Sequence, residues 1–169
     1  MTNAMEQLYQ QVILDHAKFP HGRGLTTDAV APGHAIGESH QVNPTCGDEV
    51  TLRVDIDPAD GVPVLRTVSW EGQGCSISQA SISVLTDLVT GAELTEVDRL
   101  AETFRQLMHA RGAGLDPDQE DALGDATAFT GVAKYPARIK CALLGWAALR
   151  DAVARSGAGL PATTSQELP

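Results

Sequence analysis

The sequence is poor in aromatic residues and in positive charge, and both shortages limit what the protein can bind. Its 169 residues are 4% aromatic, and 12 Lys and Arg stand against 22 Asp and Glu, which gives a formal net charge of -10. Such a charge argues against a surface that follows nucleic-acid phosphates or anionic lipid, and it favours a basic or amphipathic protein partner. We therefore expect no nucleic-acid partner.

Long apolar segments are also missing from the sequence. No run approaches the roughly 20 apolar residues that span a bilayer, and the N-terminus lacks a basic segment followed by an apolar block and a cleavage site. We therefore expect no membrane association and a cytoplasmic location.

Cysteine is scarce, since the chain has only Cys46, Cys75 and Cys141, and no two of them form a C-x-x-C pair. An odd number of widely spaced cysteines fits neither a disulfide framework nor a thioredoxin-like motif, and the spacing excludes zinc fingers. In a reducing cytosol these residues are thiols or thiolates. Any site that they share must be assembled by the fold.

The first half of the sequence predicts one helix and a small antiparallel sheet. Residues 4–17 are expected to form an amphipathic helix, and segments 34–42, 49–57 and 63–72 have strand character. The apolar stripe of the helix is predicted to comprise Met5, Leu8, Val12 and Ile13. The second strand alternates cleanly, so that one face is predicted to carry Val50, Leu52, Val54 and Ile56.

The second half has helical periodicity. Ser76-x-x-Gln79 resembles a capping box and Thr95-x-x-Asp98 opens a second helix, which predicts helices that end near Gly91 and Gly112, and Pro136 suits the first turn of a last helix. The predicted inward residues of the middle helices include Ala80, Val84, Leu85, Val97, Leu100, Phe104, Leu107 and Met108.

Strands followed by helices indicate an α+β domain in which helices cover one face of a three-stranded antiparallel sheet. We expect a single domain over residues 1–155. Within it, residues 113–134 are interpreted as an extra segment with a weak helical signal at 117–123. Residues 156–169 are expected to be a disordered tail. Trp70 and Trp146 are assigned to the core.

The segment NPTCGDEV places a thiol and a carboxylate two positions apart in a tight turn. Gly47 can adopt a positive φ, so Cys46 and Asp48 can point to the same side. Cys75 follows GQG at a predicted helix start, where unpaired N–H groups lower the pKa of a thiol. Cys141 lies early in the last helix, after the cations Arg138 and Lys140, which would further favour a thiolate.

If the three thiolates and Asp48 converge, they form a Cys3Asp set that fills a tetrahedral zinc shell. The same groups suit an iron-sulfur cluster, so the chemistry alone does not choose between them. Three unrelated buried thiols are the structural alternative. His16 and His21 follow the N-terminal helix and are interpreted as helix-end or surface groups rather than ligands.

Four segments together resemble the IscU/NifU-type iron-sulfur assembly proteins, and most closely the SufU branch: LYQQVILDHAKFPHGRG, NPTCGDEV, WEGQGCSISQAS and YPARIKCALLGWAAL. The long interval between the second and third cysteines, which contains residues 113–134, is similar to a SufU insertion. Two departures separate the chain from IscU scaffolds. Lys140 stands where they have His, and YPARIK replaces their L-P-P-V-K chaperone-docking motif.

The resemblance implies an IscU-like α+β sandwich with Cys46, Asp48, Cys75 and Cys141 as Zn2+ ligands. It implies sulfur transfer, in which Cys46 accepts persulfide sulfur from a SufS-type PLP-dependent cysteine desulfurase for downstream SUF assembly proteins. The alternative is a scaffold that assembles a transient iron-sulfur cluster on the same ligands. A domain in which zinc is purely structural would have no effect on a desulfurase.

Overall fold

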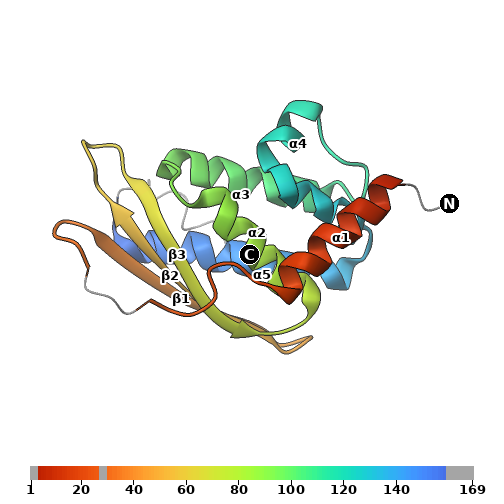
Figure 1. The fold of residues 1–169 in the computed structure, drawn as a ribbon, viewed down its shortest axis with the longest axis horizontal. Coiled ribbons are helices and arrows are strands. Elements are labelled where there is room, and N and C mark those ends of the chain that lie inside the picture. The colour runs from red at the N-terminus through yellow and green to blue at the C-terminus, as the bar shows by residue number, and fades with distance from the viewer. Residues whose placement is uncertain (1–3, 27–29, 159–169) are drawn as a thin grey trace.

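The computed structural model describes residues 4–26 and 30–158, so almost all of the predicted tail, residues 156–169, lies outside the described residues. Figure 1 shows the elements in chain order. They are α1 (Ala4–Lys18), β1 (Ala35–Asn43), β2 (Asp48–Asp57), β3 (Val64–Gln73), α2 (Ser76–Val89), α3 (Leu94–His109), α4 (Pro117–Leu123), the 3-10 helix η1 (Gly124–Lys134) and α5 (Pro136–Ser156). This is the predicted α+β class.

The three strands form one antiparallel sheet in the order β1-β2-β3, which confirms the predicted meander. Side chains of β2 are alternately buried and partly buried along its whole length, because one face of the sheet is covered and the other is not. The buried face carries the predicted residues Val50, Leu52, Val54 and Ile56.

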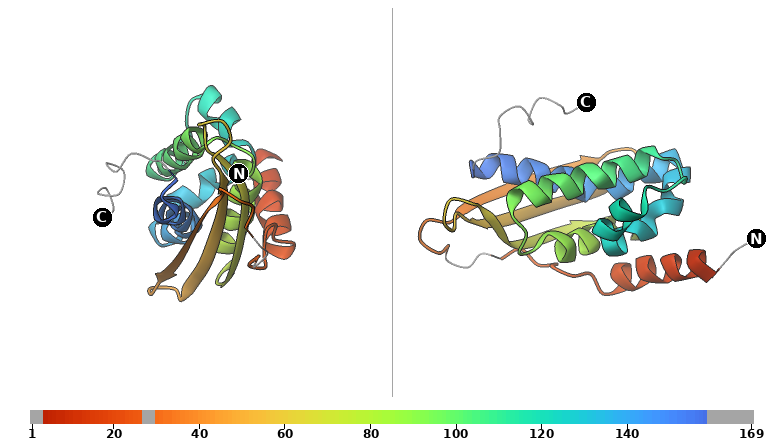
Figure 2. Two further views of the ribbon diagram at one scale, coloured as in Figure 1. Left: turned by 90° about the vertical axis from the view of Figure 1, so that its left-hand side faces the viewer. Right: turned by 90° about the horizontal axis from the view of Figure 1, so that it is seen from above.

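Helices supply the cover of the buried sheet face. The last helix, α5, packs against β1, β2 and α2, and α1 packs against α2 and η1. Figure 2 shows α5 and α1 on opposite sides of the molecule. In the described residues, no helix combines the length and the apolar character that crossing a bilayer requires.

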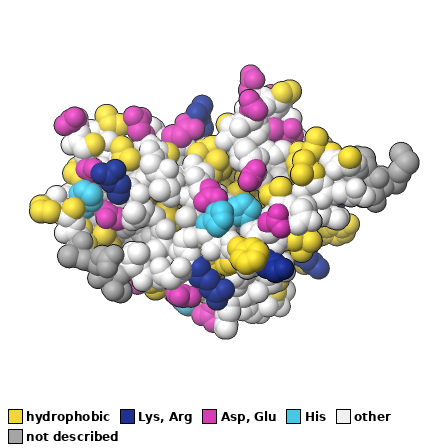
Figure 3. Space-filling model, in the orientation of Figure 1, with side chains coloured by type: hydrophobic (Ala, Val, Ile, Leu, Met, Phe, Trp, Pro, Cys, Tyr) yellow, Lys and Arg dark blue, Asp and Glu magenta, His cyan; other side chains and the backbone are white. Residues whose placement is uncertain are grey.

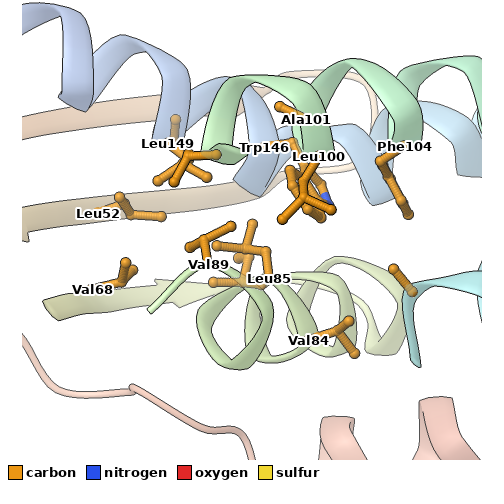
Figure 4. Packing of buried hydrophobic residues seen from close by; sticks show 14 of the residues in the cluster. Leu52, Val68, Val84, Leu85, Val89, Leu100, Ala101, Phe104, Trp146 and Leu149 are labelled. Atoms are coloured by element: carbon orange, nitrogen blue, oxygen red, sulfur yellow. The ribbon is translucent and has the colours of Figure 1, made fainter. Parts of the chain in front are cut away.

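Aromatic side chains from three elements meet in the core, and Figure 4 labels two of them, Phe104 and Trp146. Trp146 of α5 stacks on Phe104 of α3 with ring centroids 4.9 Å apart, and Phe129 of η1 contacts the edge of Phe104 at 5.9 Å. Trp70 is fully buried, so both tryptophans lie in the core as predicted. Since Phe129 is fully buried as well, the segment interpreted as an extra one supplies part of the core itself.

The apolar stripe predicted for α1 is wrong at its N-terminal end. Met5 is 54% exposed and Leu8 is 56% exposed. The helix contacts α2 and η1 through a neighbouring stripe, in which Tyr9 and Val12 are partly buried and Ile13 is buried. Hydrophobic spacing defines two overlapping stripes here, and only the packing against α2 selects one of them.

The capping box predicted at Ser76 and the helix start predicted at Thr95 are also wrong. Cys75 is the N-cap of α2, one residue before Ser76, and Glu93 is the N-cap of α3, two residues before Thr95. For α2 the difference matters, because a cysteine then occupies the position where backbone N–H groups are unpaired.

The backbone of α5 lies against β1 at Gly37, and this contact yields a test of the fold. A Cβ atom at Gly37 would overlap the carbonyl oxygen of Ala152 in α5. We expect Gly37→Ala to lower the free energy of unfolding by about 1–3 kcal/mol, because the helix must move away from the sheet. Gly131→Ala is the matched control, since a Cβ there meets no atom within 4 Å. Equal urea midpoints for the two variants would contradict this account.

Candidate metal centre

The site begins with a carboxylate at the first residue of β2. Asp48 shares the buried face of the strand with Val50 and Leu52, and it is 1% exposed. A carboxylate buried in this way requires hydrogen-bond donors. The backbone N–H of Cys75 donates to Oδ1 at 2.9 Å, and the Cys46 thiol donates to Oδ2 at 2.9 Å.

Cys46 lies in the turn that connects β1 to β2. The Asn43 side chain accepts the N–H of Thr45 at 3.2 Å, the Gly47 N–H donates to the Asn43 carbonyl at 2.9 Å, and Gly47 has a φ of 75°. This is the conformation that the NPTCGD pattern predicted. It leaves the Cys46 residue exposed while its sulfur lies beside Asp48.

Cys75 reaches the site because β3 pairs with β2 up to Gln73, opposite Glu49. The chain then passes so close to Asp48 that a Cβ at Gly74 would overlap the Asp48 carboxylate. The close approach expected from the flanking glycines is therefore present. The Cys75 sulfur lies 3.8 Å from Asp48 Oδ2. The buried Ser78 hydroxyl donates to the Cys75 carbonyl at 3.1 Å, a contact that no sequence pattern indicated.

Cys141 comes from the second turn of α5 and is 3% exposed. Its sulfur lies 3.5 Å from the sulfur of Cys46. Burial raises the pKa of Cys141 well above its ordinary value, and hydrogen bonds with Asp48, Cys46 and Cys75 raise it further. The predicted thiolate stabilisation by Arg138 and Lys140 does not occur in this arrangement, since both side chains are exposed and the thiol is buried beside a carboxylate.

The protonation of Asp48 follows from the same contacts. Burial raises the pKa of this carboxyl group, but hydrogen bonds from Cys46, Cys141 and Cys75 together outweigh burial, so its pKa lies below the usual value. Asp48 therefore carries a buried negative charge, and the donors that surround it in the described part of the chain are thiols and a backbone amide. A cation is the natural counterpart of such a group of acceptors.

The spacing of the donor atoms agrees with a tetrahedral ion. Zinc–sulfur bonds of about 2.3 Å place two thiolates about 3.8 Å apart, close to the 3.5 Å between Cys46 and Cys141. One ligand atom from each of Cys46, Asp48 and Cys141 lies within 4.8 Å of the others, a group that could hold a metal ion. Cys75 is not one of these three residues, but it contacts both Asp48 and Cys141.

A groove of about 610 Å³ lies next to the site. Its walls include Tyr9 and Ile13 of α1, Ser76 directly after Cys75, and Tyr135 and Arg138 at the start of α5. The helix starts that carry Cys75 and Cys141 thus border a concave surface that is open to solvent.

The chain is similar in sequence to a family of known proteins. The family model of the NifU-like N-terminal domain matches residues 8–154. The chain is 36% identical over 155 residues to the zinc-dependent sulfurtransferase SufU of Bacillus subtilis, which covers 92% of this chain and 95% of that protein. It is 39% identical over 153 residues to the iron-sulfur cluster assembly scaffold protein IscU of Streptococcus pyogenes, with 90% and 86% covered.

A solved structure has the same fold. The crystal structure of SufU from Fervidobacterium islandicum AW-1, described as a scaffold candidate for the SUF system, superposes with a TM-score of 0.72 at 31% identity. The superposition covers 88% of this chain and 98% of the other.

The different surroundings of the three thiols predict an order of reactivity. After chelation and reduction, we expect Cys46 to react with iodoacetamide first and Cys141 last, because Cys46 is exposed and Cys141 is buried with a raised pKa. Peptide mass spectrometry over a time course measures the three rates, and urea-unfolded protein is the control, where the rates should converge. Faster alkylation of Cys141 than of Cys46 in the folded protein would overturn the order.

Proposed function

The chain belongs to the family of NifU-like N-terminal domains, and we propose that within it the protein is a zinc-dependent sulfur acceptor for iron-sulfur cluster assembly. In this proposal Cys46 receives sulfur from the persulfide of a SufS-type, PLP-dependent cysteine desulfurase. The observation that carries the proposal is the contrast among the thiols of one cluster, of which Cys46 alone is exposed. The similarity of the chain to a relative named a zinc-dependent sulfurtransferase supports the same assignment.

The transfer itself is a thiol–persulfide exchange that balances without an oxidant or reductant. The Cys46 thiolate attacks the outer sulfur of the desulfurase persulfide, the S–S bond of that persulfide breaks, and the desulfurase cysteine leaves as a thiolate. Cys46 then carries the persulfide. The attacking group must be accessible and partly ionised, which favours an exposed turn residue over a buried one.

The other residues of the cluster have supporting roles in this proposal. Asp48 accepts the proton of the Cys46 thiol in a hydrogen bond of 2.9 Å and so orients its sulfur. Cys75 is fixed at a helix N-cap and Cys141 within a helix, so neither backbone segment can swing outward as a turn can. Both are therefore proposed as anchors of the site rather than as acceptors.

The donor set of three thiols and one carboxylate fits Zn2+, and Cys46, Asp48, Cys75 and Cys141 would hold it. When bound, the ion would keep the thiols deprotonated and supply folding free energy. The turn between β1 and β2, the register of the strands and the starts of α2 and α5 hold these donors in position. The partners proposed are the desulfurase and downstream SUF assembly proteins, in the cytoplasm.

A scaffold function is the second candidate, because the chain is also 39% identical to a relative named an IscU scaffold. The same thiols and carboxylate suit the irons of a transient iron-sulfur cluster. In that case Cys46 would be a cluster ligand.

Metal content separates the two candidates. We expect the purified protein to retain about one zinc per chain through dialysis, since a filled Cys3Asp shell matches tetrahedral zinc. Cys75→Ser should lose this zinc and unfold at a lower temperature, because metal binding contributes to folding free energy. Elemental analysis, a sulfide assay and thermal denaturation measure these quantities. Stoichiometric iron and acid-labile sulfide, with little zinc, would support the scaffold instead.

The acceptor is identified by mapping the persulfide. We expect incubation with a SufS-type desulfurase and cysteine to place one extra sulfur on Cys46, since it is the accessible thiol of the cluster. Trapping with an alkylating agent and peptide mass spectrometry locate the sulfur, and turnover of the desulfurase is measured in parallel.

Cys46→Ser is the test variant in the same assay. It should acquire no persulfide and should not stimulate the desulfurase, whereas wild type should do both. Sulfur on Cys141 with Cys46 unmodified, together with full stimulation by Cys46→Ser, would reverse the assignment.

A further inference from the structure

Two histidines and an aspartate form a second group of potential metal ligands, remote from the thiols. His16 lies near the end of α1, His21 lies in the segment that follows, and Asp87 lies near the end of α2. One ligand atom from each lies within 4.8 Å of the other two. The two imidazole rings are 4.9 Å apart between centroids.

His16 is held by its surroundings in an orientation suited to a ligand. It is 8% exposed, and its Nδ1 forms a hydrogen bond of 2.7 Å with the Ser83 hydroxyl. The same hydroxyl accepts the backbone N–H of His21 at 2.8 Å. A partner on one imidazole nitrogen fixes the ring and leaves the other nitrogen, Nε2, for a metal. Ser83 thus positions both histidines.

A hydrogen bond joins His21 and Asp87 at a place where a metal ion could lie between them. His21 Nδ1 lies 2.6 Å from Asp87 Oδ2, and the side chains of both residues are 52% exposed. Metal ligands about 2.1 Å from an ion stand about 3.4 Å apart in a tetrahedron, so these two atoms must separate by about 0.8 Å. Half-exposed side chains can make this movement by small rotations.

The charge of the cluster matches a divalent ion. Asp125, at the start of η1, lies 3.6 Å from His16 Nε2 but outside the group of three, so its exposed side chain would have to turn toward the ion to supply a fourth ligand. With neutral imidazoles the two carboxylates carry two negative charges, and the ion pairs found for them in the described residues are with histidine alone. Figure 3 shows two histidine side chains next to each other on one face of the molecule, with acidic side chains adjoining them.

We propose that His16, His21 and Asp87, with Asp125 as a fourth ligand, form a second binding site for a divalent transition-metal ion such as Zn2+. Imidazole and carboxylate ligands suit such ions. The bound ion would connect α1 and the segment after it to α2 and η1, where α1 makes its contacts with the rest of the fold. Half-exposed ligands make this site weaker and more exchangeable than a buried thiolate site.

The second site is separate from the thiols and does not depend on the proposed function. Cys75 and Asp87 stand at the two ends of α2, twelve residues apart, which corresponds to about 18 Å along a helix axis. The two sites also differ in donor atoms, which allows their metal content to be distinguished by spectroscopy.

Cobalt titration of the full chain tests the proposal. Protein carrying its tightly held zinc is titrated with Co2+, which has a lower affinity than Zn2+ for a given site and so leaves the thiolates occupied. We expect one additional Co2+ per chain with micromolar affinity. Its visible absorption should arise without the intense ultraviolet band of thiolate-to-cobalt charge transfer. The affinity should fall at least tenfold in His21→Gln and in Asp87→Asn.

The substituted side chains are half-exposed, so a loss of Co2+ binding in these variants would not result from unfolding. His21 and Asp87 have half-exposed side chains, whereas His16 is buried and is left unchanged. The control is His109→Gln, an exposed histidine on α3 that pairs with Arg105, and it should bind the extra Co2+ as wild type does. The proposal is overturned if no additional Co2+ binds, if all variants bind it equally, or if the bound Co2+ shows the thiolate band.

Discussion

Asp48, the buried first residue of β2, is a carboxylate that needs hydrogen-bond donors, and the architecture of the metal centre follows from how it obtains them. Its side chain is directed into the core by the alternation of β2, the same alternation that buries Val50 and Leu52. Its partners come from the hairpin turn before it and from the helix start after β3. Each hydrogen bond therefore connects segments whose relative position the sheet register has already fixed.

The third cysteine depends on a different constraint, the close seating of α5 on the sheet. Gly37 allows the α5 backbone to contact β1, and Trp146 fixes the inner face of the helix by stacking on Phe104. Phe129 of η1 completes this aromatic group. A shift of α5 would carry Cys141 away from Cys46, so the packing of the core and the geometry of the centre are coupled.

Helix α2 connects the two groups of ligands. Its N-cap residue Cys75 lies beside Asp48, and its last two turns present Ser83 and Asp87 to His16 of α1 and to His21 in the segment after α1. The contact between α1 and α2 therefore includes polar groups as well as Tyr9, Val12 and Ile13. Since Met5 and Leu8 are exposed, the N-terminal half of α1 gains little from burial, and its attachment relies on the end that carries His16.

The sequence by itself determined the class of fold, the strands and the identity of the chemical groups at the centre. Alternation in β2, the turn signals around Cys46 and the helical period of α3 are local patterns, because each follows from the geometry of a single element. The NPTCGDEV turn and the glycines before Cys75 also predicted the close approach that the structure has. The resemblance carried by the cysteine segments agrees with the matched family.

Tertiary structure alone decided the properties that depend on contacts between elements. Which stripe of α1 is buried, which residue caps α2 and whether residues 124–134 enter the core depend on neighbours distant in the sequence. The raised pKa of Cys141 is of the same kind, because burial beside Asp48 outweighs the cations that precede it in the chain. The approach of His16 and His21 to Asp87 likewise requires α1 to pack on α2, since about 70 residues of sequence separate these groups while less than 5 Å separates their ligand atoms.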